Sequence, residues 1–412
     1  MVDVIELRRL EFDARQRARE LRRAVFEAFN ADAVKDLAEA ERNLQQISDQ
    51  RAAEEKTQGL DDGGLVNIRS EANLLGPLTT GIDVKVHLRI SSIPTSIVHL
   101  FTAEEQPLVS YEILNTSGKT KRLRLICHVE QFSATAVETI EVEDRKPVSC
   151  AQLPTFFTDR IRRVTEINRA SVNVEVQDLD EKTEVHRTMP IWLLARSTAP
   201  LKVKDPASGT WKDLTRYLGA FVTPNAPSIM SYLRTALDKQ PNKRLVGYQV
   251  GPEKVAAGSQ TDPDEVTSQV KAVFDALKES GVAYINSIID FTPEAGSANS
   301  QRVRVPRESL RDRSANCIDG TVLVASLLEA ISLNPAIVVV PGHAFVGWET
   351  WRNNNDWRYL ETTMIDTGSF EDACQQAEGT AQQWQAIDQG ANTMFKRWSL
   401  RDLRAMGITP LE

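Results

Sequence analysis

The pattern of apolar and polar positions changes twice along the chain, and the first segment is strongly helical. Residues 4–56 are rich in Glu, Arg, Ala, Leu and Gln and contain neither Gly nor Pro. Their apolar positions form a narrow, drifting stripe: Leu7, Leu10, Leu21, Val25, Phe29, Leu37, Leu44 and Ile47. Such a stripe is typical of a helix that packs on a hairpin partner or on another chain. We expect residues 1–58 to form a helical arm or hairpin, and we favour packing within the protein over a dimerising coil.

A second segment, residues 82–198, alternates between apolar and polar positions in the way of strands that bury one face. The alternation is clearest in residues 84–90 and 122–129. About seven short strands separated by turns predict an antiparallel β-sandwich of the immunoglobulin-like kind. Residues 59–81, which precede it, contain several glycines and little periodicity, so they are predicted to form a linker.

The remaining residues, 199–412, begin with a stretch, residues 198–210, that contains two prolines and a Ser-Gly, and we expect a domain boundary there. Helical and strand patterns alternate here. A helix starting near residue 317 is expected to end at Asn334-Pro335, because proline lacks the amide proton. Three strands are then predicted, over residues 336–340, 343–348 and 357–363. The chain as a whole is thus expected to be a multidomain α+β protein.

Three side chains in this last region have the types and spacing needed for thiol catalysis. Cys317 begins the helix, where unpaired amide groups and the helix dipole favour a thiolate. His343 begins a strand and is the only histidine beyond residue 200, so it is the expected general base. Glu361 lies eighteen residues further on, and an even separation places both side chains on one face of a hairpin. Glu361 is therefore the predicted orienting acid, and Asp366 is the reserve.

Each of these residues also has an ordinary structural interpretation. A single cysteine at a helix start is usually a small buried hydrophobic residue. A single histidine at a strand start is usually a structural group with satisfied hydrogen bonds. The combination of both with a carboxylate in register favours a catalytic triad over coincidence.

The same segment resembles the core of the transglutaminase-like superfamily, which includes cysteine peptidases and transglutaminases. The resemblance rests on a Cys that opens a helix, a helix body rich in small residues, a Gly-His-Ala strand and a Trp-x-x-Leu-Asp-x-Thr strand. Here the last motif runs from Trp357 to Thr363, and Glu361 stands where the family usually has Asp. The resemblance implies that residues 199–412 form a transglutaminase-like (papain-like) α+β catalytic domain.

The function that the resemblance implies is acyl transfer through a thioester, and a cysteine endopeptidase is the preferred form. Cys317 would attack an amide carbonyl, His343 would transfer the proton, and Glu361 would orient His343. The backbone amide of Cys317 is expected to hold the oxyanion, and Asn316 is a candidate for the supporting donor.

Two other functions remain open at this point. One is a transglutaminase, in which an acceptor tunnel would be lined by Trp348, Trp351 and Trp357, although packing explains these residues more simply. The other is a non-catalytic protein-binding module that acts through the arm and the sandwich. An intact Cys-His pair argues against the second.

Composition and charge further restrict the classes of protein to which this chain can belong. The chain has 412 residues, of which 41% are hydrophobic and 26% charged, as in ordinary globular proteins. A net charge of −8 argues against a general binder of nucleic acid or anionic membranes. No apolar run is long enough for a bilayer, and four cysteines in so long a chain fit a reducing compartment. Without a Cys/His cluster or a Gly-rich phosphate loop, we expect a cytoplasmic protein with no metal and no cofactor.

The partner that the sequence implies is a protein. The arm and the sandwich contain no predicted chemistry, so we expect them to dock a protein substrate or partner, and the arm can also support self-association. Five arginines precede the cysteine: Arg302, Arg304, Arg307, Arg311 and Arg313. A solvated face paired with Glu308 and Asp312 is favoured over a subsite for an acidic substrate segment.

Overall fold

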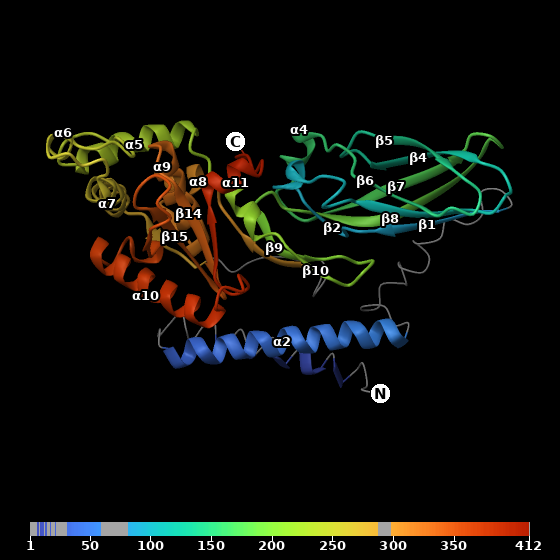
Figure 1. Ribbon diagram of the computed structural model, residues 1–412, viewed down its shortest axis with the longest axis horizontal. Coiled ribbons are helices and arrows are strands. Elements are labelled where there is room, and N and C mark those ends of the chain that lie inside the picture. Colours follow the sequence, from blue (N-terminus) through green and yellow to red (C-terminus); the bar gives the residue numbers. More distant parts are fainter. Residues whose placement is uncertain are drawn as a thin grey trace. The chain divides into compact units, whose positions relative to one another are not determined.

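The computed structural model shows a mixed α+β protein with several separate sheets (Figure 1). It describes residues 31–58, 81–286 and 298–411, together with scattered positions between residues 6 and 21. The predicted linker at residues 59–81 lies almost entirely outside this part. Two compact units are present. The mixed unit comprises Met1–Glu54, Arg216–Ile288 and Val303–Glu412, and the β unit comprises Glu55–Thr215 and Ile289–Arg302.

The β unit contains short strands, most of them in the segments where the sequence alternates. They are β1 (Ile82–Leu88), β2 (Ser92–Pro94), β3 (Val109–Asn115), β4 (Lys121–Val129), β5 (Ala136–Val142), β6 (Val148–Gln152), β7 (Asn168–Asp178) and β8 (Thr183–Leu194). One sheet has the order β1-β3-β6 and the other β2-β8-β7-β4-β5, with only β2 and β8 parallel. The Gln152 side chain donates a hydrogen bond to the Leu125 carbonyl at 3.2 Å, which joins β6 of one sheet to β4 of the other.

The β unit continues past residue 198, where the sequence predicts a domain boundary. Thr198–Lys204 forms β9, the central strand of a further sheet with β10 (Trp211–Asp213) and β12 (Ala298–Arg302). Pro200, which suggested a linker, lies in β9 beside a shift of register in β12, and such an irregularity tolerates the missing amide proton. Residues 211–221 form β10 followed by the 3₁₀ helix η2 (Thr215–Phe221). The two units accordingly divide at residues 215 and 216.

The mixed unit is built on an antiparallel sheet of order β16-β15-β14-β17. Its strands are β14 (Pro335–Val340), β15 (His343–Glu349), β16 (Trp357–Leu360) and β17 (Lys396–Ser399). Helix α9 (Cys317–Ala330) precedes β14, so the predicted order of one helix and three strands is confirmed. The third strand ends at Leu360, earlier than predicted, and the chain continues into the 3₁₀ helix η3 (Thr362–Met364).

Further helices and two short strands complete the mixed unit (Figure 1). The helices are α5 (Pro227–Lys239), α6 (Pro252–Ala256), α7 (Pro263–Glu279), α8 (Pro306–Asp312), α10 (Phe370–Asp388) and α11 (Leu400–Ala405). The two-residue strands β11 (Ala283–Tyr284) and β13 (Ser314–Ala315) pair in parallel. Strand β13 leads directly into the cysteine-bearing helix α9, so β11 is anchored beside the start of that helix.

Helix α2 (Ala31–Gln58) of the N-terminal arm packs on the mixed unit. Leu37 is fully buried and Ala38 nearly so, and both belong to one apolar cluster with β14, β15, β16 and α10 (Figure 1). The cluster's other buried members are Val338, Val340, Phe345, Tyr359, Ala377, Ala381, Trp384 and Phe395. Packing of the arm within the protein is thereby confirmed at these two residues, and α2 is part of the core rather than a separate domain.

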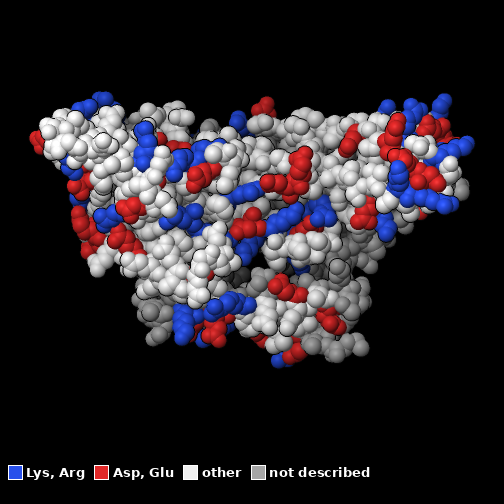
Figure 2. All heavy atoms as spheres, in the orientation of Figure 1, with Lys and Arg blue, Asp and Glu red and all other residues white. Residues whose placement is uncertain are grey.

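The surface shows no segregation of charge on the face drawn in Figure 2, where basic and acidic side chains are interspersed. Among the helices in the described part of the chain, none is long and apolar enough to cross a membrane.

Leu37→Ala is expected to destabilise the mixed unit by roughly 2–5 kcal/mol, because it removes a buried side chain and leaves a cavity between α2 and the sheet. The control is Met230→Ala in α5 of the same unit, where the side chain is 51% exposed and the change should stay within about 0.5 kcal/mol. Denaturant unfolding of the full chain measures both. Equal, small effects would show that α2 does not contribute to this core.

Candidate active site

The position of the candidate nucleophile is fixed by a helix cap. The Asn316 side chain accepts a hydrogen bond from the Asp319 amide at 2.8 Å, and the Asp319 carboxylate accepts from the Asn316 amide at 3.2 Å. This reciprocal capping box starts α9 and makes Cys317 its first residue. The Asn316 side chain, predicted as a supporting donor for an oxyanion, is therefore engaged in the cap.

The structure brings the three predicted triad residues together from three separate elements. The Nε2 atom of His343, at the start of β15, lies 2.7 Å from Oε2 of Glu361, just beyond β16. Cys317 lies close enough to the His343 ring to contribute to raising its pKa. Because Nε2 is engaged by Glu361, Nδ1 is the ring nitrogen left for the sulfur. Cys317 is 8% exposed, and the His343 and Glu361 side chains are 17% and 5% exposed, so the group is buried but reachable.

Electrostatics favour an ionised His343–Glu361 pair. Burial alone would lower the pKa of His343, but the Glu361 charge and hydrogen bonds with Cys317 and Glu361 raise it well above 6.5. Burial would likewise raise the pKa of Glu361, but the His343 charge and hydrogen bonds from His343 and Thr363 lower it below 4.5. Thr363 donates to Oε1 of Glu361 through its amide at 3.0 Å and through its hydroxyl at 2.7 Å. Oε2 is thereby left to face the imidazole.

Asp366, the reserve acid, is placed elsewhere. It is exposed, and its carboxylate accepts a hydrogen bond from the Tyr284 amide at 3.4 Å. In the β15–β16 ladder Gly347 pairs with Tyr359, and residues two apart along each strand share a face. This register directs His343 and Glu361 to the same side, as their even separation predicts.

Close packing holds the cysteine-bearing helix against the segment that carries the acid. The Cys317 carbonyl accepts hydrogen bonds from the hydroxyls of Thr321 at 2.7 Å and Thr362 at 3.3 Å. A Cβ atom at Gly320 would lie only 2.8 Å from the Thr362 hydroxyl oxygen. Glycine at this position therefore allows α9 to approach η3 closely enough for the hydrogen bond from Thr362 to form.

Tyr284 belongs to the same site, and sequence reasoning missed it. It pairs with Ala315 in the short β11–β13 ladder, two residues before Cys317. Burial and then the charges of Cys317 and Glu361 raise the pKa of Tyr284 well above 10. The phenol consequently stays neutral and keeps a proton to donate. A two-residue strand has no periodicity, so no sequence pattern could have indicated this residue.

The imidazole rests on the apolar cluster that includes α2. The rings of His343 and Phe345 have centroids 6.0 Å apart, and those of Phe345 and Tyr359 are 5.8 Å apart, edge to face. Phe345 and Tyr359 both belong to the cluster that contains Leu37. The arm thus contributes to the packing behind the candidate base.

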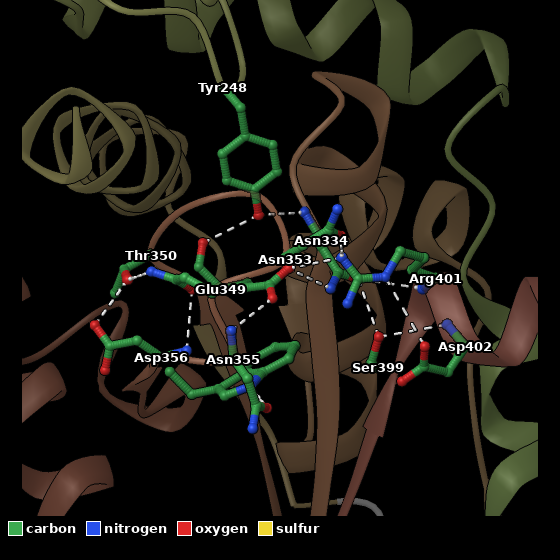
Figure 3. Close-up of polar contacts among 12 residues, drawn as sticks. Tyr248, Asn334, Glu349, Thr350, Asn353, Asn355, Asp356, Ser399, Arg401 and Asp402 are labelled. Atoms are coloured by element: carbon green, nitrogen blue, oxygen red, sulfur yellow. Dashed lines mark hydrogen bonds and ion pairs between the residues drawn. The ribbon is translucent and has the colours of Figure 1, made fainter. Parts of the chain in front are cut away.

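The opposite end of β15 is held by a second buried carboxylate (Figure 3). Glu349 is fully buried and accepts hydrogen bonds from the Asn334 side chain at 2.9 Å, the Asn355 amide at 3.0 Å and Arg401 at 3.0 Å. Burial would raise the pKa of Glu349, but the hydrogen bonds, from Asn334 first, and the Arg401 charge lower it below 4.5. Every one of these partners is structural, so this network anchors the strand rather than supplying a reacting group.

The three tryptophans considered for an acceptor tunnel have separate packing partners. Trp348 is fully buried and packs on Phe370. Trp351 meets the ring of Tyr248 edge to face. The ring of Trp357 lies beneath the Arg397 guanidinium, 4.7 Å from the ring centroid. Packing accounts for all three.

Among the five arginines before the cysteine, Arg304 and Arg311 have identified structural partners. Arg304 donates to the carbonyl and hydroxyl oxygens of Ser314, and its own amide donates to Asp319 at 2.8 Å. Arg311 pairs with Asp312, as the solvated-face interpretation predicts. Arg304 therefore supports the capping box instead of facing a substrate.

Metal-ligand side chains gather elsewhere, in the β unit. In the part of the chain that the structure describes, Glu175, Glu184 and His186 have ligand atoms within 4.8 Å of one another. His186 lies 3.2 Å from Glu184 in the same strand, β8, and 3.6 Å from Glu175 in β7, and both are ordinary ion-pair contacts. No residue of the candidate triad belongs to this group.

Comparison of the chain with family models, with curated proteins and with solved structures finds no match. The function must therefore be argued from the geometry of the site.

Glu361→Gln is expected to slow hydrolysis of an activated ester such as p-nitrophenyl acetate by roughly 10²–10⁴-fold, because the amide neither fixes the imidazole tautomer nor stabilises its charge. The pH profile should shift as well. Since the Glu361 charge raises the pKa of His343, its loss should lower that pKa, and the dependence on protonated His343 should move to lower pH.

Asp366→Asn is the matched control, because it makes the same kind of change at the exposed carboxylate and should leave the rate near that of wild type. An inactive Asp366→Asn variant beside a fully active Glu361→Gln variant would reverse the assignment of the acid.

Proposed function

We propose that this protein is a cysteine endopeptidase of the transglutaminase-like kind, and that Cys317, His343 and Glu361 are its catalytic triad. The observation that supports this most strongly is the linked pair of contacts at His343, with the Cys317 thiol on one side and the Glu361 carboxylate at 2.7 Å on the other. Nucleophile, base and orienting acid in this order are the parts that acyl transfer requires.

The proposed reaction begins with attack of the Cys317 sulfur on a peptide carbonyl, while the sulfur's proton resides on His343. The tetrahedral intermediate collapses with cleavage of the C–N bond, and His343 gives its proton to the leaving amine. A thioester remains on Cys317. His343 then removes a proton from water, the hydroxide attacks the thioester, and the thiol and a carboxylic acid are released. Glu361 holds the imidazole and stabilises its positive charge throughout.

The oxyanion of the tetrahedral intermediate needs two donors, and the proposal assigns both. The first is the Cys317 backbone amide, which lies in the first turn of α9, where amides have no partner within the helix. The second is the Tyr284 hydroxyl, which stays protonated and lies near enough to Cys317 to be affected by its charge. Tyr284 replaces Asn316 in this role, because the Asn316 side chain caps the helix.

Water is the preferred acyl acceptor in this proposal. Transfer to an amine needs a dry aromatic channel, and the tryptophans that could have lined one each pack against a different neighbour. Hydrolysis is therefore favoured over transamidation.

The β unit is the proposed site of partner binding. Its antiparallel sheets are consistent with an immunoglobulin-like sandwich, and it contains none of the triad residues. The arm has a smaller docking role than the sequence implied, because Leu37 and Ala38 are buried in the mixed unit. The residues of α2 beyond that contact remain the proposed surface for self-association.

Mapping of new protein N-termini tests the proposal. Cells that express the wild-type chain should contain cleavage products that are absent with Cys317→Ala, because only Cys317 forms the acyl-enzyme. Cys374→Ala is the matched control and should give the wild-type products, since Cys374 is a buried residue of α10. Identical products from wild type and Cys317→Ala would refute the peptidase. Glutamine–amine cross-links in place of new N-termini would assign the transglutaminase reaction instead.

A further inference from the structure

The β unit contains a cavity of about 360 Å³ that takes no part in the proposed reaction. It is an open depression bordered by the turn that follows β4 and by the segment between α4 (Thr158–Ile161) and β7. We call it the arginine pocket, and its lining residues are Gln131, Phe132, Arg160, Arg163, Val164, Thr165, Glu166, Ile167 and Asn168. Its volume falls within the range of roughly 300–1,000 Å³ that is typical of small-molecule sites.

The wall that carries the arginines is firmly held. Ile161 and Val164 are 3% and 6% exposed, so they anchor this turn in the core. The Arg163 amide donates to the Arg160 carbonyl at 3.2 Å, and the Arg196 amide donates to the Val164 carbonyl at 2.8 Å. The opposite wall is tied to the same segment, because the Phe157 amide donates to the Phe132 carbonyl at 2.8 Å. The backbone of both walls is therefore fixed by hydrogen bonds.

The charge of the pocket favours an anion. Among the described residues, no carboxylate lies within ion-pair distance of Arg160 or Arg163. Guanidinium groups without a carboxylate partner bind phosphate well, because their planar fork matches two of its oxygens.

The remaining lining residues indicate a ligand that has other groups besides an anion. Phe132 offers an aromatic ring, and Phe157, at the start of the same turn, is 45% exposed. Glu166 places one carboxylate in the wall, which would repel a polyanion but can accept hydrogen bonds from sugar hydroxyls or from amino groups of a base. Thr165 and Asn168 add polar side chains. These residues would together suit a ligand that combines an anion, an aromatic ring and hydroxyl groups, as a nucleotide does.

We propose that the arginine pocket binds a mononucleotide, with Arg160 and Arg163 on its phosphate, Phe132 against its base and Glu166 on its sugar or base. This function is separate from the proposed peptidase activity, since none of the lining residues belongs to the mixed unit that contains the triad.

Calorimetric titration of the full-length wild-type chain with AMP and GMP tests the proposal, with inorganic phosphate and adenosine as partial ligands. At least one nucleotide should bind saturably with one site per chain. Phosphate alone and adenosine alone should each bind about tenfold or more weakly, because each lacks half of the contacts. The absence of saturable nucleotide binding up to millimolar concentration would overturn the proposal. Phosphate binding as tight as nucleotide binding would also overturn it, by reducing the site to a simple anion site.

Substitutions in the arginine pocket test whether the nucleotide binds there. Arg160→Ala combined with Arg163→Ala should weaken nucleotide binding about tenfold or more, and Phe132→Leu should weaken nucleotide binding while leaving phosphate binding unchanged. Arg169→Ala is the control for charge alone, because Arg169 lies next to Asn168 in sequence but does not line the pocket. Circular dichroism confirms that each variant is folded. An equal loss of affinity with Arg169→Ala would place the nucleotide outside this pocket and refute the assignment.

Discussion

The buried ion pair between His343 and Glu361 is the interaction on which the candidate site depends. Both side chains are largely removed from water, and burial opposes the charge on each. Two hydrogen bonds from Thr363 and the short contact with His343 compensate for this cost at the carboxylate. The pair exists only if β15 and the end of β16 keep their register. Several contacts in the mixed unit hold these two strands in that register.

Both ends of β15 are fixed, by different kinds of interaction. At its start, the His343 ring lies against Phe345, and the cluster behind Phe345 extends to Leu37 in the N-terminal helix α2. At its far end, Glu349 is bound by Asn334 and Arg401. Helix α9 is positioned independently, through its capping box and its contact with Thr362. Apolar packing, a buried polar network and a helix cap thus together position Cys317, His343 and Glu361.

The sequence predicted those parts of the site that follow local rules. The cap at Asn316 places Cys317 first in its helix, and the even separation of His343 and Glu361 puts them on one face. The helix ends at Ala330, before the predicted stop at Asn334-Pro335, and Pro335 instead begins β14. Local rules could not predict the elements that depend on packing between residues distant in the sequence. The short strand of Tyr284 is defined only by its partner at Ala315, and β9 was hidden because its proline lies beside a bulge in a paired strand. The burial of Leu37 depends on residues about 300 positions away in the sequence, which periodicity alone could not identify.

The reactivity of the four thiols tests the central claim most directly. Burial first, with lesser contributions from nearby charges at two of the sites, raises the pKa values of Cys127, Cys150 and Cys374 to about 12, so these thiols stay protonated and inert at neutral pH. Limiting iodoacetamide at neutral pH, followed by peptide mapping, should therefore label Cys317 alone, and His343→Ala should slow that labelling because the base beside the sulfur is gone. Labelling of Cys127 or Cys374 as fast as Cys317 in the folded protein, or a rate at Cys317 unaffected by His343→Ala, would contradict a functional Cys317–His343–Glu361 unit.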